Sequence, residues 1–204
     1  MKILLPFVIA MTFVVVVSNI LVQYPFQPFG LGEILTWGAF TYPFAFLVND
    51  LTNRRFGKLA ARRVVAVGFI IALGLSVWLA SPRIAIASGS AFLIAQLIDI
   101  GIFDRLRNQD WWRAPLLSTL IGSAVDTVLF FGIAFAPVFA ELDTSLGLED
   151  GSLGFPASLF GIAMPLYASL AIGDFLVKLL IGVIALVPYA GILRVTGQAK
   201  SSAV

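Results

Sequence analysis

Six runs of apolar residues follow one another along this chain of 204 residues, and they constrain its fold more than any other feature. Each is close to the roughly 20 residues that an α-helix needs to cross a bilayer. With 60% hydrophobic and 12% charged residues, the chain has more apolar surface than a water-soluble domain of this length can bury. The sequence therefore predicts an all-α integral membrane protein, a single domain over residues 1–204. Its six transmembrane helices are expected near residues 3–22, 34–51, 64–81, 84–103, 116–139 and 166–190.

The loop between the third and fourth runs is very short. It consists of little more than Ser81, Pro82 and Arg83. Helices joined by so few residues lie side by side and antiparallel. The sequence thus predicts a tight helical hairpin over residues 64–103.

The distribution of lysine and arginine predicts which side of the membrane each loop faces, because these residues favour the cytoplasmic side. If the chain starts in the cytoplasm, Arg83 is the one basic residue outside and Lys178 lies within the sixth run. The long outer loop "ELDTSLGLEDGSLGFPAS" then carries only acidic charges. We therefore expect both termini to be cytoplasmic. The other eleven of the thirteen basic residues would lie inside: Lys2, Arg54, Arg55, Lys58, Arg62, Arg63, Arg105, Arg107, Arg113, Arg194 and Lys200.

Residue types on which many enzymes and metalloproteins depend are missing from the sequence. There is no cysteine and no histidine, which removes thiol chemistry and the commonest metal ligand. No loop of the GxxxxGK[ST] type is present, so we do not expect ATP hydrolysis by this chain. A net charge of +2 is too small to indicate a nucleic-acid partner. The sequence therefore predicts no enzyme activity, no cofactor and no metal site, and membrane lipid as the surroundings.

Several charged residues nevertheless lie inside the apolar runs. Asp99 is in the fourth run, Asp126 in the fifth, and Asp174 and Lys178 in the sixth, while Asp50 marks the inner end of the second. Each ionisable group in a membrane span costs about 2.5–3.5 kcal/mol, so such groups usually face the bundle interior or a water-filled cavity. A chain of six spans with interior carboxylates is typical of a small-molecule carrier or of the membrane subunit of one. The alternative is a non-transporting scaffold whose interior charges form salt bridges only.

The fourth and fifth runs each place polar residues on one helical face. Gln96 and Asp99 stand at i and i+3 in the fourth run. In the fifth, Gly122 and Ser123 share a stripe with Asp126, with Thr119 one turn before them and Phe130 one turn after. Small residues on such a stripe favour close helix packing. Packing alone would be served by alanine without a desolvation cost, so we interpret Asp126 as lining a site.

Asp174 and Lys178 stand four residues apart, which is the spacing for an ion pair on one helix. Such a pair makes both charges tolerable and can serve packing alone. For Lys178 the sequence leaves two interpretations open: a purely internal salt bridge, or a pair that opens during transport.

The second run contains a proline followed by a polar group. Pro43 removes a backbone hydrogen bond and is expected to kink the helix. Interrupted helices in transporters often lie beside the substrate site. Asn49, Asp50 and Asn53 follow the kink directly. We expect these residues to line a polar cavity that opens toward the cytoplasm.

Four stretches of the chain together form a recognisable pattern. They are "SNILVQYPF", "LTWGAFTYPFAFLVNDLTNRRFGKLAARR", "AQLIDIGIFDRLRNQDWWRAPLLSTLIGSAVDTVLFFGIAF" and "GDFLVKLLIGVIALVPYAGIL". In this order they closely resemble the YhhQ/VUT-type queuosine precursor transporters.

The resemblance implies import of 7-cyano-7-deazaguanine across a bacterial inner membrane, with 7-aminomethyl-7-deazaguanine as a related cargo, for queuosine modification of tRNA. It also implies a six-helix fold similar to the substrate-binding subunits of energy-coupling factor transporters. Separate ATPase subunits or a second copy of the chain remain open as partners, as does another flat heterocycle as cargo.

A 7-deazapurine of this kind has a flat ring and a guanine-like edge with two adjacent N–H donors and a carbonyl acceptor. A carboxylate can accept both N–H groups, and an amide can serve the carbonyl. Asp99 or Asp126 is the candidate for the donor edge, and Gln96 or Asn49 for the carbonyl; the sequence does not rank the two aspartates. Other candidates are the ring-stacking residues Phe103, Phe130, Trp37 and Tyr42, the charged Asp50 and Lys178, and Ser18, Asn19 and Gln23 on the first helix.

The energy source is open at this point. The cargo is essentially neutral, so the membrane potential alone does not concentrate it. Facilitated diffusion, proton coupling through Asp126 or Asp99, and an external ATPase are the alternatives. Without histidine, proton coupling has to run through carboxylates.

Overall fold

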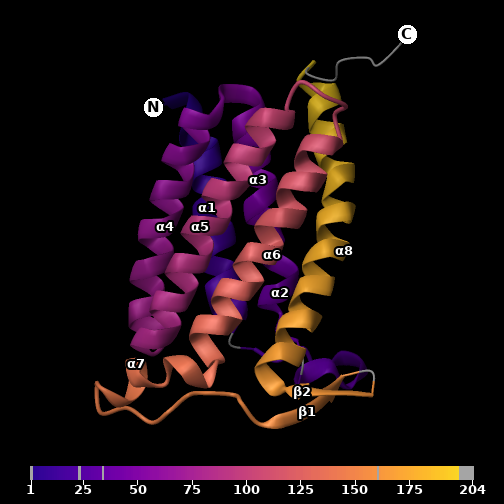
Figure 1. Cartoon of the computed structure of the whole chain (residues 1–204). Coiled ribbons are helices and arrows are strands. Elements are labelled where there is room, and N and C mark those ends of the chain that lie inside the picture. Colours follow the sequence, from indigo (N-terminus) through magenta and orange to yellow (C-terminus); the bar gives the residue numbers. More distant parts are fainter. Residues whose placement is uncertain (1, 23, 34, 160, 198–204) are drawn as a thin grey trace.

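The computed structural model describes residues 2–22, 24–33, 35–159 and 161–197 and shows an upright helical bundle (Figure 1). Short 3₁₀ helices lie at Lys2–Leu4, Pro28–Glu33 and Pro137–Phe139. Strands β1 (Pro156–Leu159) and β2 (Ile162–Pro165) form one antiparallel hairpin. The α-helices are α1 (Leu5–Leu21), α2 (Gly38–Thr41), α3 (Pro43–Phe56), α4 (Lys58–Leu79), α5 (Pro82–Leu106), α6 (Arg113–Phe135), α7 (Glu141–Thr144) and α8 (Leu166–Val195).

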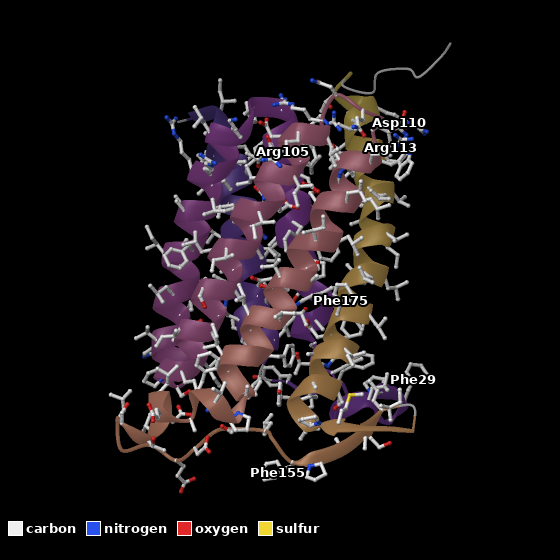
Figure 2. All side chains as sticks on the ribbon, viewed as in Figure 1. Phe29, Arg105, Asp110, Arg113, Phe155 and Phe175 are labelled. Atoms are coloured by element: carbon white, nitrogen blue, oxygen red, sulfur yellow. The ribbon has the colours of Figure 1, made fainter. Side chains whose placement is uncertain are left out.

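The bundle has two distinct ends. Helix α1 begins and α8 ends at the same end, which we call the terminal end (Figure 1). At the opposite end, the hairpin end, lie α7 and the β1–β2 hairpin. Arg105, Asp110 and Arg113 lie at the terminal end, whereas Phe29 and Phe155 lie at the hairpin end (Figure 2).

Four of the predicted spans are helices with the length and hydropathy needed to cross a membrane. They are α4, α5, α6 and α8, with mean hydropathies of 1.8, 1.8, 1.8 and 2.4 over their most apolar windows. Helix α1 is apolar but shorter, with 17 residues. The prediction of a multi-pass helical membrane protein is thus confirmed in its coarse form.

The second predicted span is divided at its proline. Helix α2 ends at Thr41, and Pro43 opens α3 after the single residue Tyr42. Proline fits the first turn of a helix because its missing N–H has no intrahelical partner there. The expected break at Pro43 is confirmed, and α3 runs on to Phe56, five residues past the predicted end at residue 51.

The five basic residues between positions 54 and 63 belong to helices rather than to a loop. Gly57 alone separates α3 from α4, and its φ of 82° lies in the region that favours glycine. Helix α4 therefore begins at Lys58, six residues before the predicted start at residue 64. The tight turn between α4 and α5 is confirmed, since the Ile84 N–H donates to the Ser81 side chain, 3.3 Å away, and caps α5.

Small residues let the central helices approach closely. A Cβ added at Gly122 of α6 would lie 2.7 Å from the Phe46 ring of α3, so that only glycine fits there. On the other side of the bundle, Gly68 of α4 packs in the same manner against Met11 of α1. The packing seam predicted on α6 is therefore real, and it brings the polar residues of α3, α5 and α6 together.

Arg83 fastens the hairpin end. Its side chain is 1% exposed, and it donates to the backbone oxygens of Ile133 (2.8 Å) and Ala136 (2.6 Å) at the end of α6. It also donates to a carboxylate oxygen of Asp143 (3.0 Å) and to the Ser152 hydroxyl (3.1 Å). This single side chain thus ties the α4–α5 turn to the acidic segment that follows α6.

Candidate functional site

A cavity of about 510 Å³ lies inside the bundle, in the half toward the hairpin end. It is bounded by the last residues of α1, by α2, by the end of α4, by the start of α5, and by α6 and α8. Its volume lies within the range of roughly 300–1,000 Å³ that is usual for small-molecule sites. The polar and aromatic residues that line it are Ser18, Asn19, Thr36, Tyr42, Ser76, Ser88, Asp126, Phe130, Phe131, Phe135, Asp174 and Lys178.

One wall of the cavity is charged. Lys178 of α8 donates from Nζ to Asp126 Oδ2 on α6 at 2.7 Å and forms a second ion pair with Asp174, one turn earlier on α8. The Thr127 hydroxyl links the group further, since it donates to Asp174 at 2.9 Å and lies 3.3 Å from Lys178 Nζ. Lys178 also lies over the Tyr42 ring, 5.4 Å from its centroid. We call Asp126, Asp174 and Lys178 the charged triad.

The charged triad has spare capacity for hydrogen-bond donors. Two carboxylates face one ammonium group, which leaves a formal charge of −1 when all three are ionised. Lys178 occupies one oxygen of each carboxylate, Oδ2 of Asp126 and Oδ2 of Asp174. A carboxylate offers about four acceptor positions. The triad can therefore accept N–H groups from a ligand without giving up its internal ion pairs.

The wall formed by α1 and α4 is polar but uncharged. Asn19 Oδ1 accepts from the Ser76 hydroxyl at 3.1 Å, and Asn19 Nδ2 donates to the backbone oxygen of Val15 at 2.9 Å. Ser18 donates to the Thr41 hydroxyl at 2.9 Å, which joins α1 to α2. Hydroxyl and amide groups thus face the cavity across from the charged triad.

Aromatic rings of α6 form a third side. Phe130, Phe131 and Phe135 pack edge to face or tilted, with centroids 5.2–5.9 Å apart. Together with Tyr42 they provide flat apolar surface beside the charged triad. A cavity that combines ring surfaces with a carboxylate wall suits a flat heterocycle with N–H donors.

Six of the predicted site residues line this cavity. They are Ser18, Asn19, Tyr42, Asp126, Phe130 and Lys178. The predicted i, i+4 ion pair of Asp174 and Lys178 is also present. The structure adds the pairing of Lys178 with Asp126, which is 52 residues away along the chain.

Four other predicted residues gather in a separate cluster where α3, α5 and α6 meet. The Asn49 amide donates to Asp99 Oδ2 at 2.8 Å and to the Gln96 backbone oxygen at 3.3 Å. The Ser118 hydroxyl donates to Asp50 at 3.3 Å. We call Asn49, Asp50, Gln96 and Asp99 the buried polar cluster; each is at most 2% exposed. The cluster does not line the 510 Å³ cavity, contrary to the expectation of an opening below Pro43, because α5 and α6 cover it.

The remaining candidates lie elsewhere. Trp37 packs edge to face on Phe26, with a centroid distance of 4.7 Å, and is 42% exposed. Phe103 lies beneath the Arg54 guanidinium, 5.2 Å away, in a buried group near the terminal end. Gln23 lies outside the residues that the structure describes.

Sequence reasoning missed part of the cavity lining. Phe131 and Phe135 stand four residues apart in "LFFGIAF" and so share a helical face beside the predicted one. Ser76 carried no such signal, because its place beside Asn19 depends on how α4 packs against α1.

Comparison with known proteins places these residues in a family. A family model described as "Putative vitamin uptake transporter" matches residues 36–81 and 75–193. The chain is 41% identical over 143 residues to the protein named "Queuosine precursor transporter" of Escherichia coli K12; the alignment covers 60% of this chain and 64% of that protein. No solved structure matches significantly.

Two further relatives extend the alignment. The "Probable queuosine precursor transporter" of Haemophilus influenzae is 33% identical over 211 residues, which cover 88% of this chain and 81% of that protein. The protein of the same name from Bacillus subtilis is 24% identical over 179 residues, with coverages of 74% and 77%. The matched region thus spans less than two thirds of the Escherichia coli protein but more of the other two.

Proposed function

The chain belongs to the family of vitamin uptake transporters, and from that premise we propose that it imports a queuosine precursor, 7-cyano-7-deazaguanine, through the 510 Å³ cavity. The cargo class follows the names of the three relatives. The observation that carries the proposal is the charged triad, which places acceptor oxygens beside the rings of α6. The related 7-aminomethyl compound is a second candidate cargo.

We propose six membrane crossings in the bacterial inner membrane: α1, the α2–α3 pair, α4, α5, α6 and α8. An even number of crossings agrees with the position of the start of α1 and the end of α8 at one end of the bundle (Figure 1). Arg105 and Arg113 lie at that terminal end (Figure 2), which supports its assignment to the cytoplasm. Arg83, at the opposite end, is neutralised by Asp143 and Asp150. The proposed fold class is that of the substrate-binding subunits of energy-coupling factor transporters.

The binding mode follows from the donors and acceptors in the cavity. The guanine-like edge presents two adjacent N–H groups, and Asp126 accepts them with the oxygen positions that Lys178 leaves open. Lys178 Nζ lies beside that carboxylate. Its most distant acceptor is the Thr127 hydroxyl, at 3.3 Å, and in the complex the ligand carbonyl takes the place of this hydroxyl as acceptor. The ring stacks on the aromatic surface around Phe130. Asp126, rather than Asp99, is thus the proposed partner of the donor edge.

The test is queuosine formation in cells that neither make the precursor nor possess their own importer. These cells receive 7-cyano-7-deazaguanine and express the intact chain, Asp126→Asn or Asp110→Asn. Asp110 forms an exposed ion pair with Arg113 at the terminal end and serves as the matched control. We expect queuosine in tRNA with the intact chain and with Asp110→Asn, and its loss with Asp126→Asn at equal abundance in the membrane.

Other outcomes would contradict the proposal in distinguishable ways. If no variant yields queuosine, the cargo is another flat heterocycle or the protein is a scaffold. Direct binding of such heterocycles to the purified protein separates these two cases. If Asp126→Asn yields as much queuosine as the intact chain, the cargo assignment stands but the binding mode is wrong.

A further inference from the structure

The buried polar cluster holds two carboxyl groups. Asp50 of α3 and Asp99 of α5 are both at most 2% exposed. Asn49, which precedes Asp50 in the chain, donates to Asp99 at 2.8 Å, and the Ser118 hydroxyl of α6 donates to Asp50 at 3.3 Å. Two ionised carboxylates that are buried in one cluster repel each other, so this arrangement favours a proton on one of them.

One cation lies near this pair of carboxyl groups. In the described part of the chain, neither Asp50 nor Asp99 forms a salt bridge. The charge of Arg54 acts on Asp50, while its guanidinium donates to the Tyr189 hydroxyl at 2.9 Å and to the Arg107 backbone oxygen. One cation can balance only one of the two carboxylates. The other would be a buried charge without a partner, so a proton is the cheapest way to hold both carboxyl groups in this place.

Charged groups on the neighbouring helices are already engaged elsewhere. On α5, Asp104 pairs with Lys58 and Arg107 near the terminal end. On α6 and α8, Asp126 and Lys178 pair with each other in the cavity wall. These charged groups are consequently not partners of the Asp50–Asp99 pair.

Unpartnered polar atoms surround the pair. Among the described residues, Asn49 Oδ1, Asp99 Oδ1, both side-chain amide atoms of Gln96 and Ser123 Oγ are buried without a hydrogen-bond partner. Asn49 reaches into the cluster, because its Nδ2 donates to Asp99. Most of these atoms are acceptors, and buried acceptors without donors are destabilising. When a carboxyl group of this pair gains or loses a proton, it gains or loses a hydrogen-bond donor, and a different set of these atoms then has a partner.

Along α6, the pair lies between the cavity and the terminal end. Thr119, which faces Asp50, precedes Asp126 of the charged triad by seven residues on α6. At 1.5 Å per residue this is about 10 Å along the helix axis. On the other side of the pair, Tyr189 and Arg54 lead toward the terminal end. A proton held here is therefore close to the substrate site and separated from it by part of one helix.

We propose that Asp50 and Asp99 form a proton-binding site whose loading and release are coupled to movement of the cargo, so that the protein is a proton symporter. This inference rests on the proposed function, because it assigns the driving ion of the same transport. One proton binds to the pair from the side opposite the terminal end and leaves toward the terminal end together with one cargo molecule. No covalent bond of the cargo changes.

The experiment uses purified protein in liposomes with the membrane potential clamped by potassium and valinomycin. Accumulation of labelled 7-cyano-7-deazaguanine is measured with an inward proton gradient, with an inward sodium gradient and with neither. We expect accumulation only with the proton gradient, up to about tenfold for one pH unit at one proton per molecule, since tenfold corresponds to 1.4 kcal/mol. Asp50→Asn and Asp99→Asn should lose this accumulation yet retain exchange of cargo across the membrane without any gradient.

Two controls keep the failure of this inference apart from failure of the proposed function. Exchange without a gradient tests cargo transport alone. Asp104→Asn, on α5 but in a partly exposed ion pair at the terminal end, should accumulate cargo like the intact chain. If the intact chain exchanges cargo but accumulates none with a proton gradient, or accumulates it with sodium, the proton site is overturned. Absence of exchange in the intact chain overturns both proposals.

A measurement on the intact chain covers the case in which the asparagine variants do not fold. The intact protein in weakly buffered solution is mixed with 7-cyano-7-deazaguanine while a dye reports pH. We expect a change in bound protons of about one per cargo molecule at saturation if cargo and proton are coupled. A pH trace that is unchanged across the acidic and neutral range would overturn the proposal.

Discussion

Two buried cations, Arg83 and Lys178, each face two aspartates, yet they have different roles in the molecule. All three guanidinium nitrogens of Arg83 donate to acceptors of the segment that follows α5. Lys178 donates to Asp126, Asp174 and Thr127, and all of its carboxylate partners line a cavity. Arg83 and Lys178 have the same formal charge, but only the acceptors around Lys178 have hydrogen-bonding positions that a ligand can reach.

This difference separates a structural ion cluster from a binding one. Around Arg83 the acceptors include the backbone oxygens of Ile133 and Ala136, which no ligand could replace without unfolding the end of α6. Around Lys178 the acceptors are side chains with open positions beside empty volume. Buried charge alone is therefore a poor indicator of a binding site. A better indicator is whether the carboxylates around the charge have free acceptor positions that face a cavity.

The largest expected effect is that of Arg83→Met. The substitution leaves Asp143, which is 3% exposed, without a counter-ion and removes the donor for two buried carbonyl groups. Breaking a buried ion pair in this way costs about 3–5 kcal/mol. We expect a large loss of thermal stability of the purified protein in detergent, with Arg62→Met on the exposed face of α4 as the unaffected control. Equal stability of the two variants would show that the Arg83 network is not structural.

Lys178→Met should be milder for stability and severe for transport. The two aspartates lose their cation, but the cavity lets water hydrate them, so we expect a cost of about 1–3 kcal/mol. Cargo uptake should nevertheless disappear, because the carboxylates repel each other and the wall no longer holds its shape. Thermal unfolding and uptake are measured on the same preparation. Should Lys178→Met be as unstable as Arg83→Met, the distinction between the two clusters would fail.

Phe130→Leu tests whether the cavity beside Lys178 binds the cargo. The variant keeps apolar volume but removes a ring that lines the cavity, and loss of a stacked ring costs about 1–3 kcal/mol of affinity. We expect cargo binding about 5- to 150-fold weaker, measured by titration of the protein in lipid discs, with stability nearly unchanged. Phe13→Leu on the exposed face of α1 is the matched control. An unchanged affinity of Phe130→Leu would place the cargo ring elsewhere.

Local features of this molecule could be predicted from its sequence. The apolar runs, the break at Pro43 and the pair of Asp174 and Lys178 each depend on residues a few positions apart. Helical geometry fixes such relations wherever the helix lies. For the same reason Asp126 and Phe130, one turn apart on α6, were predicted for the same site and do line the same cavity.

Features that depend on the packing of distant helices were beyond the sequence. Arg83 was interpreted only as a charge on the outer side of the membrane. Its pairing with Asp143 was not predicted, because the two residues are 60 positions apart in the chain. Asn49 and Asp99 were expected at the cargo site, but the close approach of Gly122 to Phe46 holds α6 over that region. No periodicity within one helix indicates which polar face meets a cavity and which meets another helix.

The smallest effect is expected at the exposed edge of the Arg83 network. The backbone N–H of Ser152 donates a hydrogen bond to the Asp150 carboxylate. Bonding to Ser152, together with the nearby charge of Arg83, lowers the pKa of the Asp150 carboxyl group below its usual value. A lowered pKa in the folded state stabilises the fold above the unfolded pKa of about 3.9, and this stabilisation disappears as the pH falls through the folded pKa. Asp150→Asn should therefore melt slightly below the intact chain at pH 7, and the difference should vanish in acid. Because Asp150 is exposed, solvent screening keeps the effect small, in contrast to the loss of Arg83. A melting difference that persists at acidic pH would show that the Asp150 side chain acts through its shape rather than its charge.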